Sequence, residues 1–212
     1  MVTKLFMAPG LVQRLLRAAR EGETPAQCVR GRHVLPTPGL RLQTPTAWDV
    51  RITYAAACDP QAQRWLGWRD LIPERDLERL LAVPPGRGPI LRRMPGELWK
   101  LAAIDPADGR IAGAITYDQD TCEVGGWLAP RFRGRGLGTG LFAGAAEFAH
   151  QHLGIPSVTA ATETGNAACI AALASAGFIP AAGPYPHTLP NGQVVPARRF
   201  RHESAQPTMC EG

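Results

Sequence analysis

The stretch WLAPRFRGRGLGTGLFAGAAEF, residues 127–148, decides the fold prediction because it joins a strand-like segment to a helix-like segment through a glycine-rich turn. Glycine occupies alternate positions at its centre, namely Gly134, Gly136, Gly138 and Gly140. A helix start presents unpaired backbone N–H groups and a partial positive charge, and glycine lets a ligand approach the backbone closely. Turns of this kind bind phosphate groups.

Two common phosphate motifs do not fit this turn. The dinucleotide fingerprint G-x-G-x-x-G would need a glycine where Thr139 stands, and a P-loop would need a Gly-Lys-Ser/Thr ending that the turn lacks. The pattern that fits is Arg-x-x-Gly-x-Gly, with Arg133, Gly136 and Gly138. Arg133 and Arg135 can add charge-assisted hydrogen bonds to a pyrophosphate. The same glycines would also suit a tight strand-to-helix turn without a ligand.

Length and composition indicate a globular protein with a core of its own. The chain has 212 residues, of which 45% are hydrophobic, which suits one α/β domain with an extension. It contains no apolar run long enough to predict a membrane span. The five cysteines are odd in number, widely spaced and without a Cys-x-x-Cys pair, which argues against a disulfide framework or a metal site. We therefore expect reduced thiols and a cytoplasmic location.

The net charge of +5 is concentrated at the front of the chain. Residues 1–38 hold six basic residues against two acidic ones, and residues 10–20 have the spacing of a short basic amphipathic helix. Three prolines then predict an irregular connector: Pro25, Pro36 and Pro38. The remaining body is nearly neutral, so we expect a local anion site rather than a nucleic-acid surface.

The body of the chain predicts strands and helices of the α/β (α+β) class. Leu40 and Leu42 alternate as in a strand, and Thr46 with Asp49 matches the capping-box pattern of a helix start. Three strands are predicted to form an antiparallel meander, at residues 97–104, 110–118 and 122–129. Helices are predicted after residue 49, around residues 60–68, from Pro73, over residues 137–152 and from Asn166 to Gly177.

The end of the body predicts a short buried strand, SVTAAT, and a closing hairpin around the Asn191-Gly192 turn. The prolines of the hairpin favour edge strands. We therefore predict three parts: a basic N-terminal extension over residues 1–38, a folded domain over residues 39–203 and a tail over residues 204–212.

Three segments resemble the GNAT family of N-acetyltransferases, most of all its ribosomal-protein alanine acetyltransferase-like and aminoglycoside-resistance-like branches. EVGGWLAPRFRGRGLGT, residues 123–139, resembles the strand, proline and acyl-CoA pyrophosphate loop of that family. NAACIAALASAGF, residues 166–178, resembles a helix that starts with asparagine and ends before Gly-Phe, with Cys169 where the family has serine. Residues 40–49 and 59–68 resemble the opening strand and first helices.

The resemblance implies a mixed, mostly antiparallel sheet that splays at an acetyl-CoA site and is flanked by helices. It implies that the backbone near Trp127 and Leu128 holds the pantetheine and polarises the thioester carbonyl. It implies that Asn166 contacts the cofactor arm, although this residue also suits a plain helix N-cap. The pyrophosphate would be received by the amides of the turn, at Gly134, Arg135, Gly136, Leu137, Gly138 and Thr139.

A group that accepts a proton from the attacking amine is also expected. Glu123 is the first candidate because it alternates onto the face of Gly125 and Trp127, and Glu163 is the second because it lies near Asn166. Either residue would equally suit a solvated surface position. Further candidates remain: Asp118, Asp120 and His187.

The chain departs from the family pattern at two places. Many relatives carry a tyrosine that protonates the departing thiolate, and Leu173 stands there. Another pattern places a glutamate five residues before the asparagine, and Ala161 stands there. A thiol has a pKa of about 8.5, so the thiolate can leave with help from water.

Three functions remain open from the sequence. The first is an acetyl-CoA-dependent N-acetyltransferase acting on a primary amine of a small molecule or antibiotic, and the second is the same chemistry on a protein N-terminus. The third is a non-catalytic acyl-CoA-binding module, which the two missing groups favour. The resemblance implies that the segments around Trp48, Trp65 and Trp68 flank the acceptor together with the hairpin around Tyr185 and His187, although core packing is the commoner role for such aromatic residues. A homodimer is also compatible with the sequence.

Overall fold

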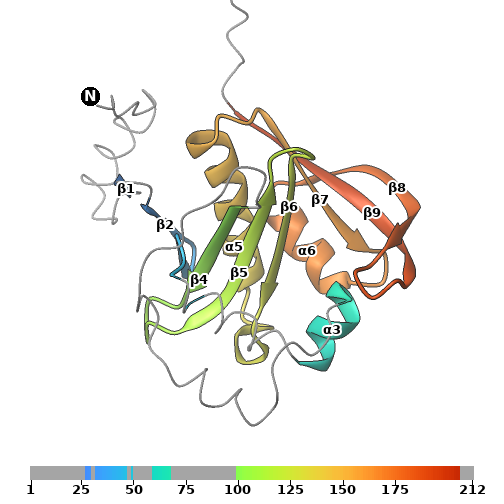
Figure 1. The fold of residues 1–212 in the computed structure, drawn as a ribbon, viewed down its shortest axis with the longest axis horizontal. Coiled ribbons are helices and arrows are strands. Elements are labelled where there is room, and N and C mark those ends of the chain that lie inside the picture. Colours follow the sequence, from blue (N-terminus) through green and yellow to red (C-terminus); the bar gives the residue numbers. More distant parts are fainter. Residues whose placement is uncertain (1–26, 30–31, 47–48, 50–58, 68–98, 206–212) are drawn as a thin grey trace, which may run out of the picture.

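A computed structural model describes most of the folded body of the chain (Figure 1). The described residues are 27–29, 32–46, 49, 59–67 and 99–205. Within them, one sheet has the strand order β1-β2-β3-β4-β5-β6-β7-β9-β8. Its strands are β1 (Gln27–Val29), β2 (Arg32–Thr37), β3 (Leu40–Gln43), β4 (Trp99–Ile104), β5 (Ile111–Asp118), β6 (Glu123–Leu128), β7 (Ser157–Glu163), β8 (Ile179–Thr188) and β9 (Val194–Glu203).

Neighbouring strands of this sheet are antiparallel except β6 and β7, which are parallel. The mixed, mostly antiparallel sheet is therefore confirmed, and so is the meander of β4, β5 and β6. The helices of the described part are α3 (Pro60–Leu66), α5 (Leu137–Glu147) and α6 (Ala167–Ser175). The turn η1 (Pro130–Phe132) precedes α5, which continues as the π-helical turn η2 (Phe148–His152).

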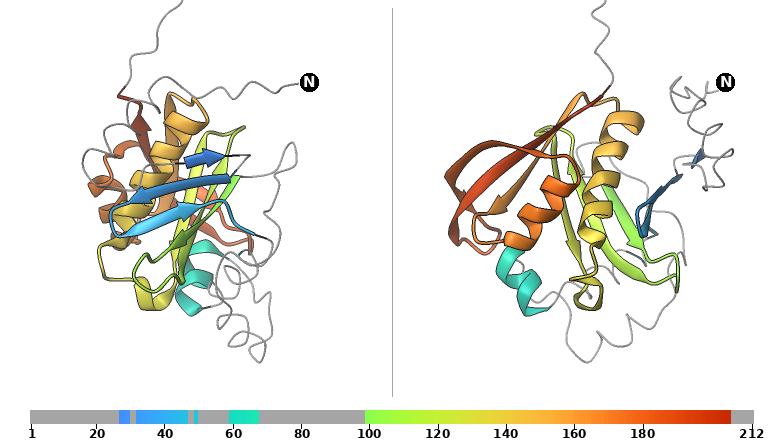
Figure 2. Two further views of the ribbon diagram at one scale, coloured as in Figure 1. Left: turned by 90° about the vertical axis from the view of Figure 1, so that its left-hand side faces the viewer. Right: turned by 180° about the vertical axis from the view of Figure 1, so that it is seen from behind.

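Two helices, α5 and α6, pack side by side, while α3 lies at one end of the sheet (Figure 2). Glycines on α5 bring this helix close to β2 and β3. A Cβ atom added at Gly140 would lie 2.1 Å from the carbonyl oxygen of Pro38, and one at Gly144 would lie 2.5 Å from Leu42. Residues larger than glycine would therefore push α5 away from the sheet.

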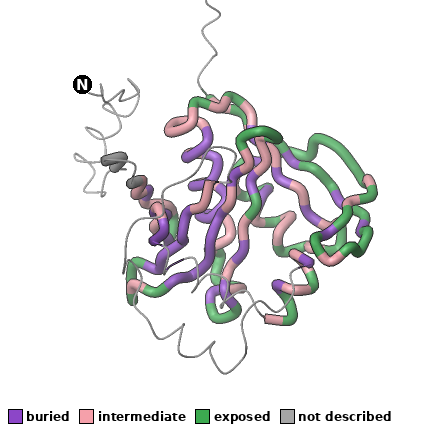
Figure 3. Tube along the Cα trace, in the orientation of Figure 1, coloured by how far each residue is buried: buried purple, intermediate pink, exposed green. Residues whose placement is uncertain are grey.

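The core lies between the sheet and α5, where the burial-coloured trace is purple (Figure 3). The helical spacing within residues 137–152 places Leu137, Leu141, Ala145, Phe148 and Ala149 on one face; the last four are at most 1% exposed, and Leu137 is partly buried. The packing of this face against the sheet removes apolar area from water, which is the main favourable term of folding.

The capping box at Thr46 and Asp49 is confirmed. The Thr46 amide donates to Asp49 Oδ2 at 2.8 Å, and the Asp49 amide donates to Thr46 Oγ1 at 3.2 Å. The predicted helices over residues 10–20, after residue 49 and from Pro73 fall on residues outside the described part. No helix in the described residues is long and apolar enough to cross a membrane.

Two predictions that were based on proline residues were wrong. Residues 32–37 form β2 rather than an irregular connector, and Pro36 pairs with Arg41 of β3. The described pairs of β1 reach to Val34, so among the described residues Pro36 has a strand on one side only, where its missing N–H is tolerated. β8 is an edge strand as predicted, but β9 lies inside the sheet with Pro196 just beyond its last pair with β7, at Ala197. The proposed limit of the N-terminal extension at residue 38 stays a prediction.

Candidate active site

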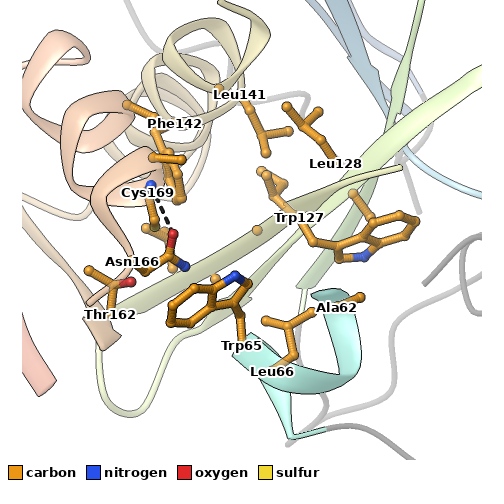
Figure 4. A pocket seen from close by; sticks show the side chains of 18 of the residues that line it. Ala62, Trp65, Leu66, Trp127, Leu128, Leu141, Phe142, Thr162, Asn166 and Cys169 are labelled. Carbon is orange, nitrogen blue, oxygen red and sulfur yellow. Dashed lines mark hydrogen bonds between the residues drawn. The ribbon is translucent and has the colours of Figure 1, made fainter. Parts of the chain in front are cut away.

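The parallel strands β6 and β7 meet at one end and separate toward the other. In the described part of the chain, the two strands are paired only at Glu123 and Thr159. There the Thr159 amide donates to the Cys122 carbonyl at 2.8 Å. Beyond this pair, the β7 side of β6 has no strand partner among the described residues. A cavity of about 920 Å³ lies there, lined by β6, β7, the glycine turn, α3, α6 and the closing hairpin. Its apolar walls appear in Figure 4.

The glycine turn presents open backbone at one wall of this cavity. Gly134 and Gly136 have positive φ angles of 70° and 76°, a conformation that favours glycine. A Cβ atom at either position would meet nothing within 4 Å. Gly136 is the N-cap of α5 and has no side chain that could accept from the first amides of the helix. This open helix start fits the pyrophosphate of CoA.

The other residues of the turn have partners within the protein. A Cβ atom at Gly138 would lie 2.8 Å from the Cβ of Ala172, so this glycine sets the approach of α5 to α6. The Thr139 amide donates to the Gly136 carbonyl at 3.3 Å, and Leu137 packs under Gly39. Arg135 is half exposed and its Nη1 lies 3.8 Å from Asp105 Oδ2. It thus keeps more freedom to reach an anion than Arg133.

Arg133 is held by three acceptors from two segments of the chain. Its Nη1 and Nη2 donate to the two carboxylate oxygens of Asp59 at 2.7 Å each, and Nη1 also donates to Gln61 Oε1 at 2.8 Å. Its Nε donates to the Leu128 carbonyl at 2.8 Å. Burial opposes ionisation of Asp59, but the bonds from Arg133, Ala62 and Gln61 outweigh it and lower the pKa of this carboxyl. The guanidinium is therefore bound to the N-terminus of α3, and its predicted contact with a pyrophosphate stays a prediction.

Trp127 and Leu128 lie on the wall opposite α6, as Figure 4 shows. Trp127 is 9% exposed, and both residues belong to the stretch of β6 that faces β7 without pairing to it. The Leu128 carbonyl accepts from Arg133 Nε, and the part of this β6 edge that has no strand partner among the described residues could receive an extended ligand, as in strand addition to a sheet edge. This edge is where the predicted pantetheine contacts would form.

Asn166 begins α6 and lines the cavity beside Thr162 and Trp65 (Figure 4). Its Oδ1 accepts from the Cys169 amide at 3.2 Å, so the N-cap interpretation is confirmed. Burial raises the pKa of the Cys169 thiol, which also lines the cavity. The contact of Asn166 with a cofactor arm stays a prediction.

The two candidate carboxylates lie at different places in the cavity. Glu123 stands at the closed end, is 32% exposed and lies 3.8 Å from Arg199. Glu163 ends β7 and forms two bonds with Arg64, at 2.6 and 2.7 Å. These bonds lower the pKa of Glu163, which makes it a weaker proton acceptor. Glu123 therefore fits the base role better.

The side of the cavity formed by α3, β4 and the hairpin, called the acceptor wall below, contains residues that the sequence analysis did not identify. α3 contributes Ala62 and Leu66, β4 contributes Lys100, and the hairpin contributes Leu189 and Val195. His187 and Trp65 also line the cavity, as the family comparison implied, whereas Arg199 packs over the ring of Tyr185. Asp59 before Pro60 was a readable N-cap signal, because proline favours the first helical position. Trp48 and Trp68 fall outside the described residues.

The two positions that depart from the family pattern also differ in location. Leu173 is fully buried, so it offers no proton at the cavity. Ala161 lines the cavity, where its methyl group can neither donate nor accept a proton. Neither position can protonate the departing thiolate, and its protonation by water stays a prediction.

The sequence itself identifies the family. A family model described as an acetyltransferase (GNAT) domain matches residues 39–179. The chain belongs to the GNAT acetyltransferases. Acetyl-CoA is the acyl donor of GNAT enzymes, and the open glycine turn and the splayed strands of this GNAT domain fit it. No curated protein matches this GNAT sequence.

Solved structures agree with the GNAT fold. A GNAT-family acetyltransferase from Bacillus anthracis has a TM-score of 0.60 and 10% identity, over 80% of this chain and 98% of that one. A ribosomal-protein-S5-alanine acetyltransferase from Vibrio fischeri has a TM-score of 0.57 and 14% identity, over 82% and 97%. A spermidine N-acetyltransferase from Vibrio cholerae, solved with CoA and spermine, has a TM-score of 0.60 and 13% identity, over 78% and 96%. Because these sequence identities are low, the similarity to the solved structures shows a shared fold and not a shared substrate.

Proposed function

We propose that this GNAT enzyme transfers an acetyl group from acetyl-CoA to a primary amine of a small molecule, by direct attack within a ternary complex. The observation that carries the proposal is the placement of Glu123 at the closed end of the cavity, with the open turn at Gly134 and Gly136 on its wall. One site thus holds a proton acceptor and an anion-binding helix start.

The residues of the chain would divide the work as follows. The turn would bind the diphosphate, and the unpaired edge of β6 would bind the pantetheine and donate to the thioester oxygen. Glu123 would accept the proton that the amine loses as its nitrogen bonds to the carbonyl carbon and the carbon–sulfur bond breaks. Acetyl-CoA supplies the activated acetyl group. Water would protonate the thiolate, because Leu173 and Ala161 cannot.

The charges of the cavity favour an uncharged or singly charged acceptor body. Each carboxylate of the lining has an arginine beside it, Arg199 for Glu123 and Arg64 for Glu163. Lys100 lines the same cavity, and the described residues place no carboxylate within ion-pair distance of it. A polycation would meet this ammonium without an excess of acids to bind it. The apolar walls, including Trp65, suit an apolar or aromatic monoamine.

A protein N-terminus is the second candidate acceptor. Ribosomal-protein acetyltransferases are among the similar structures, one of them solved with CoA. Since one cavity of about 920 Å³ is lined both by α3 and by the hairpin, an extended peptide is compatible with it. We propose a cytoplasmic location for either function, because CoA chemistry and free thiols such as Cys122 belong to reducing compartments.

A CoA-release assay across an amine panel tests the proposal. The panel contains an aromatic monoamine, a peptide with a free N-terminus and spermine, and CoA affinity is measured by calorimetry. We expect turnover with the monoamine. Turnover with the peptide alone would support the second candidate, and tight CoA binding with no turnover on any amine would support a non-catalytic acyl-CoA-binding module instead.

A further inference from the structure

The helix α3 lies near the ends of β6 and β7 at which these two strands are apart (Figure 1), and its residues line the cavity between them. Its N-cap Asp59 is bound to Arg133, and the same guanidinium donates to the carbonyl of Leu128, the last residue of β6. Near its other end, Arg64 is bound to Glu163, the last residue of β7. One short helix thus connects the ends of the two strands that separate.

The two connections are of the strong, directional kind. Each joins a guanidinium to both oxygens of one carboxylate, at 2.6 to 2.7 Å. Charge-assisted pairs with two parallel bonds set orientation as well as distance. Asp59 and Arg133 are 16% and 26% exposed, whereas Glu163 at 12% is paired with Arg64 at 50%, so water screens the Arg64 pair more than the Arg133 pair.

The helix itself is well terminated in spite of its seven residues. Asp59 Oδ1 also accepts from the amides of Gln61 and Ala62, at 3.0 and 3.2 Å, and Gly67 ends the helix in the left-handed conformation. These caps hold the first and last turns, so the distance between the two anchoring side chains is well defined.

The helix that carries the two anchors, Asp59 and Arg64, also lines the cavity. Ala62, Trp65 and Leu66 line it, opposite Trp127 and Leu128 in Figure 4. Parallel strands normally keep their spacing through evenly spaced hydrogen bonds, which β6 and β7 lack beyond Glu123 and Thr159. Something else must set the width of the cleft.

We propose that α3 is a bridging helix that holds β6 and β7 at the separation needed by the CoA arm, with Arg133 and Glu163 as positioning residues. This rests on the proposed function only in that CoA occupies the cleft. Arg133 then acts through α3 and not as a phosphate ligand. Glu163 acts through Arg64 and not as a base.

The test measures CoA binding to the full chain by calorimetry. The variants are Glu163→Gln, Arg64→Gln and the charge-exchanged double variant Arg64→Glu with Glu163→Arg. The matched control is Glu203→Gln, which removes a pair with Arg201 at 2.8 Å on β9, outside the cavity lining. Acetyl-CoA KM, kcat and the pH–rate profile are measured for each variant.

We expect each single variant to weaken CoA binding and raise the acetyl-CoA KM about fivefold, and the double variant to return both to within about twofold of the wild type. The control and the pH–rate profile should not change. Amide hydrogen exchange in α3 should become faster in the single variants, because one end of the helix is released.

Two results would overturn the bridging role. In the first, wild type and all variants bind CoA equally well, which leaves the proposed function intact and removes the bridge. In the second, Glu163→Gln loses the acidic limb of the pH–rate profile and the charge exchange does not rescue it, which makes Glu163 a base. A wild-type chain that binds no CoA would instead remove the donor site and the bridge together.

Discussion

The donor wall and the acceptor wall of the cleft are built in different ways. The donor wall comes from one continuous stretch, β6, the glycine turn and the start of α5, and it offers backbone groups. The acceptor wall combines α3, β4 and the hairpin of β8 and β9, and it offers side chains. A shared donor molecule can be recognised through backbone geometry that many sequences reach, whereas an acceptor is selected by side chains that each sequence can change.

The largest expected effect lies on the donor wall. Gly136→Asp places a side chain and a negative charge where the diphosphate binds and strains a residue with φ of 76°. We expect CoA affinity, measured by calorimetry, to fall about a hundredfold or more. Gly109→Asp is the matched control, because Gly109 also has positive φ and open space but lies in the turn between β4 and β5. If the two variants bind CoA with equal affinity, the glycine turn is not the binding site of the diphosphate.

The second largest effect is expected at Glu123, at the end of the cavity where β6 and β7 pair. Glu123→Gln removes the proposed proton acceptor without changing its size. We expect kcat/KM to fall about tenfold or more and the acidic limb of its pH profile to disappear. Glu203→Gln, an exposed acid of β9, should keep the wild-type profile. If the pH–rate profile of the Glu123 variant is unchanged, this residue has no part in the proton transfer.

On the acceptor wall, we expect the charge at Lys100 to influence which amines are accepted. Lys100→Glu replaces the ammonium of the cavity with a carboxylate, which attracts cationic acceptors. We expect the kcat/KM ratio of spermine to an aromatic monoamine to rise about fivefold, with CoA affinity unchanged. Arg110→Glu, at 61% exposure and outside the cavity lining, is the matched charge reversal. An equal shift in both variants would assign the effect to net charge instead of Lys100.

The smallest expected effect separates packing from binding within the glycine turn. Gly138→Ala brings a methyl group 2.8 Å from Ala172, so we expect a loss of about 1 kcal/mol in the free energy of unfolding. This corresponds to a decrease of about 2–4 °C in Tm. Adding Ala172→Gly should restore part of the loss. If stability is unchanged and CoA binding is weaker, Gly138 acts in CoA binding and not in the packing of α5 against α6.

The sequence predicted the donor wall well because its residues are neighbours along the chain. A strand, open glycines and a helix start are local patterns, and their joint meaning does not depend on distant segments. The partners that single side chains have within the protein could not be predicted from local patterns. Arg133 was expected to meet phosphate, but its carboxylate partner Asp59 lies 74 residues away. Glu163 was expected as a base, but Arg64 lies 99 residues away.

By itself, the sequence determined the described strands and helices from β3 onward, the meander, the capping box and the glycine turn that opens α5. These depend on periodicity, turn chemistry and caps, which act over a few residues. Only the tertiary structure decided which charges face a ligand and which face each other. Ion pairs form between whichever groups the fold brings within a few ångströms, and α3 is brought to the ends of β6 and β7 by packing that no local pattern records.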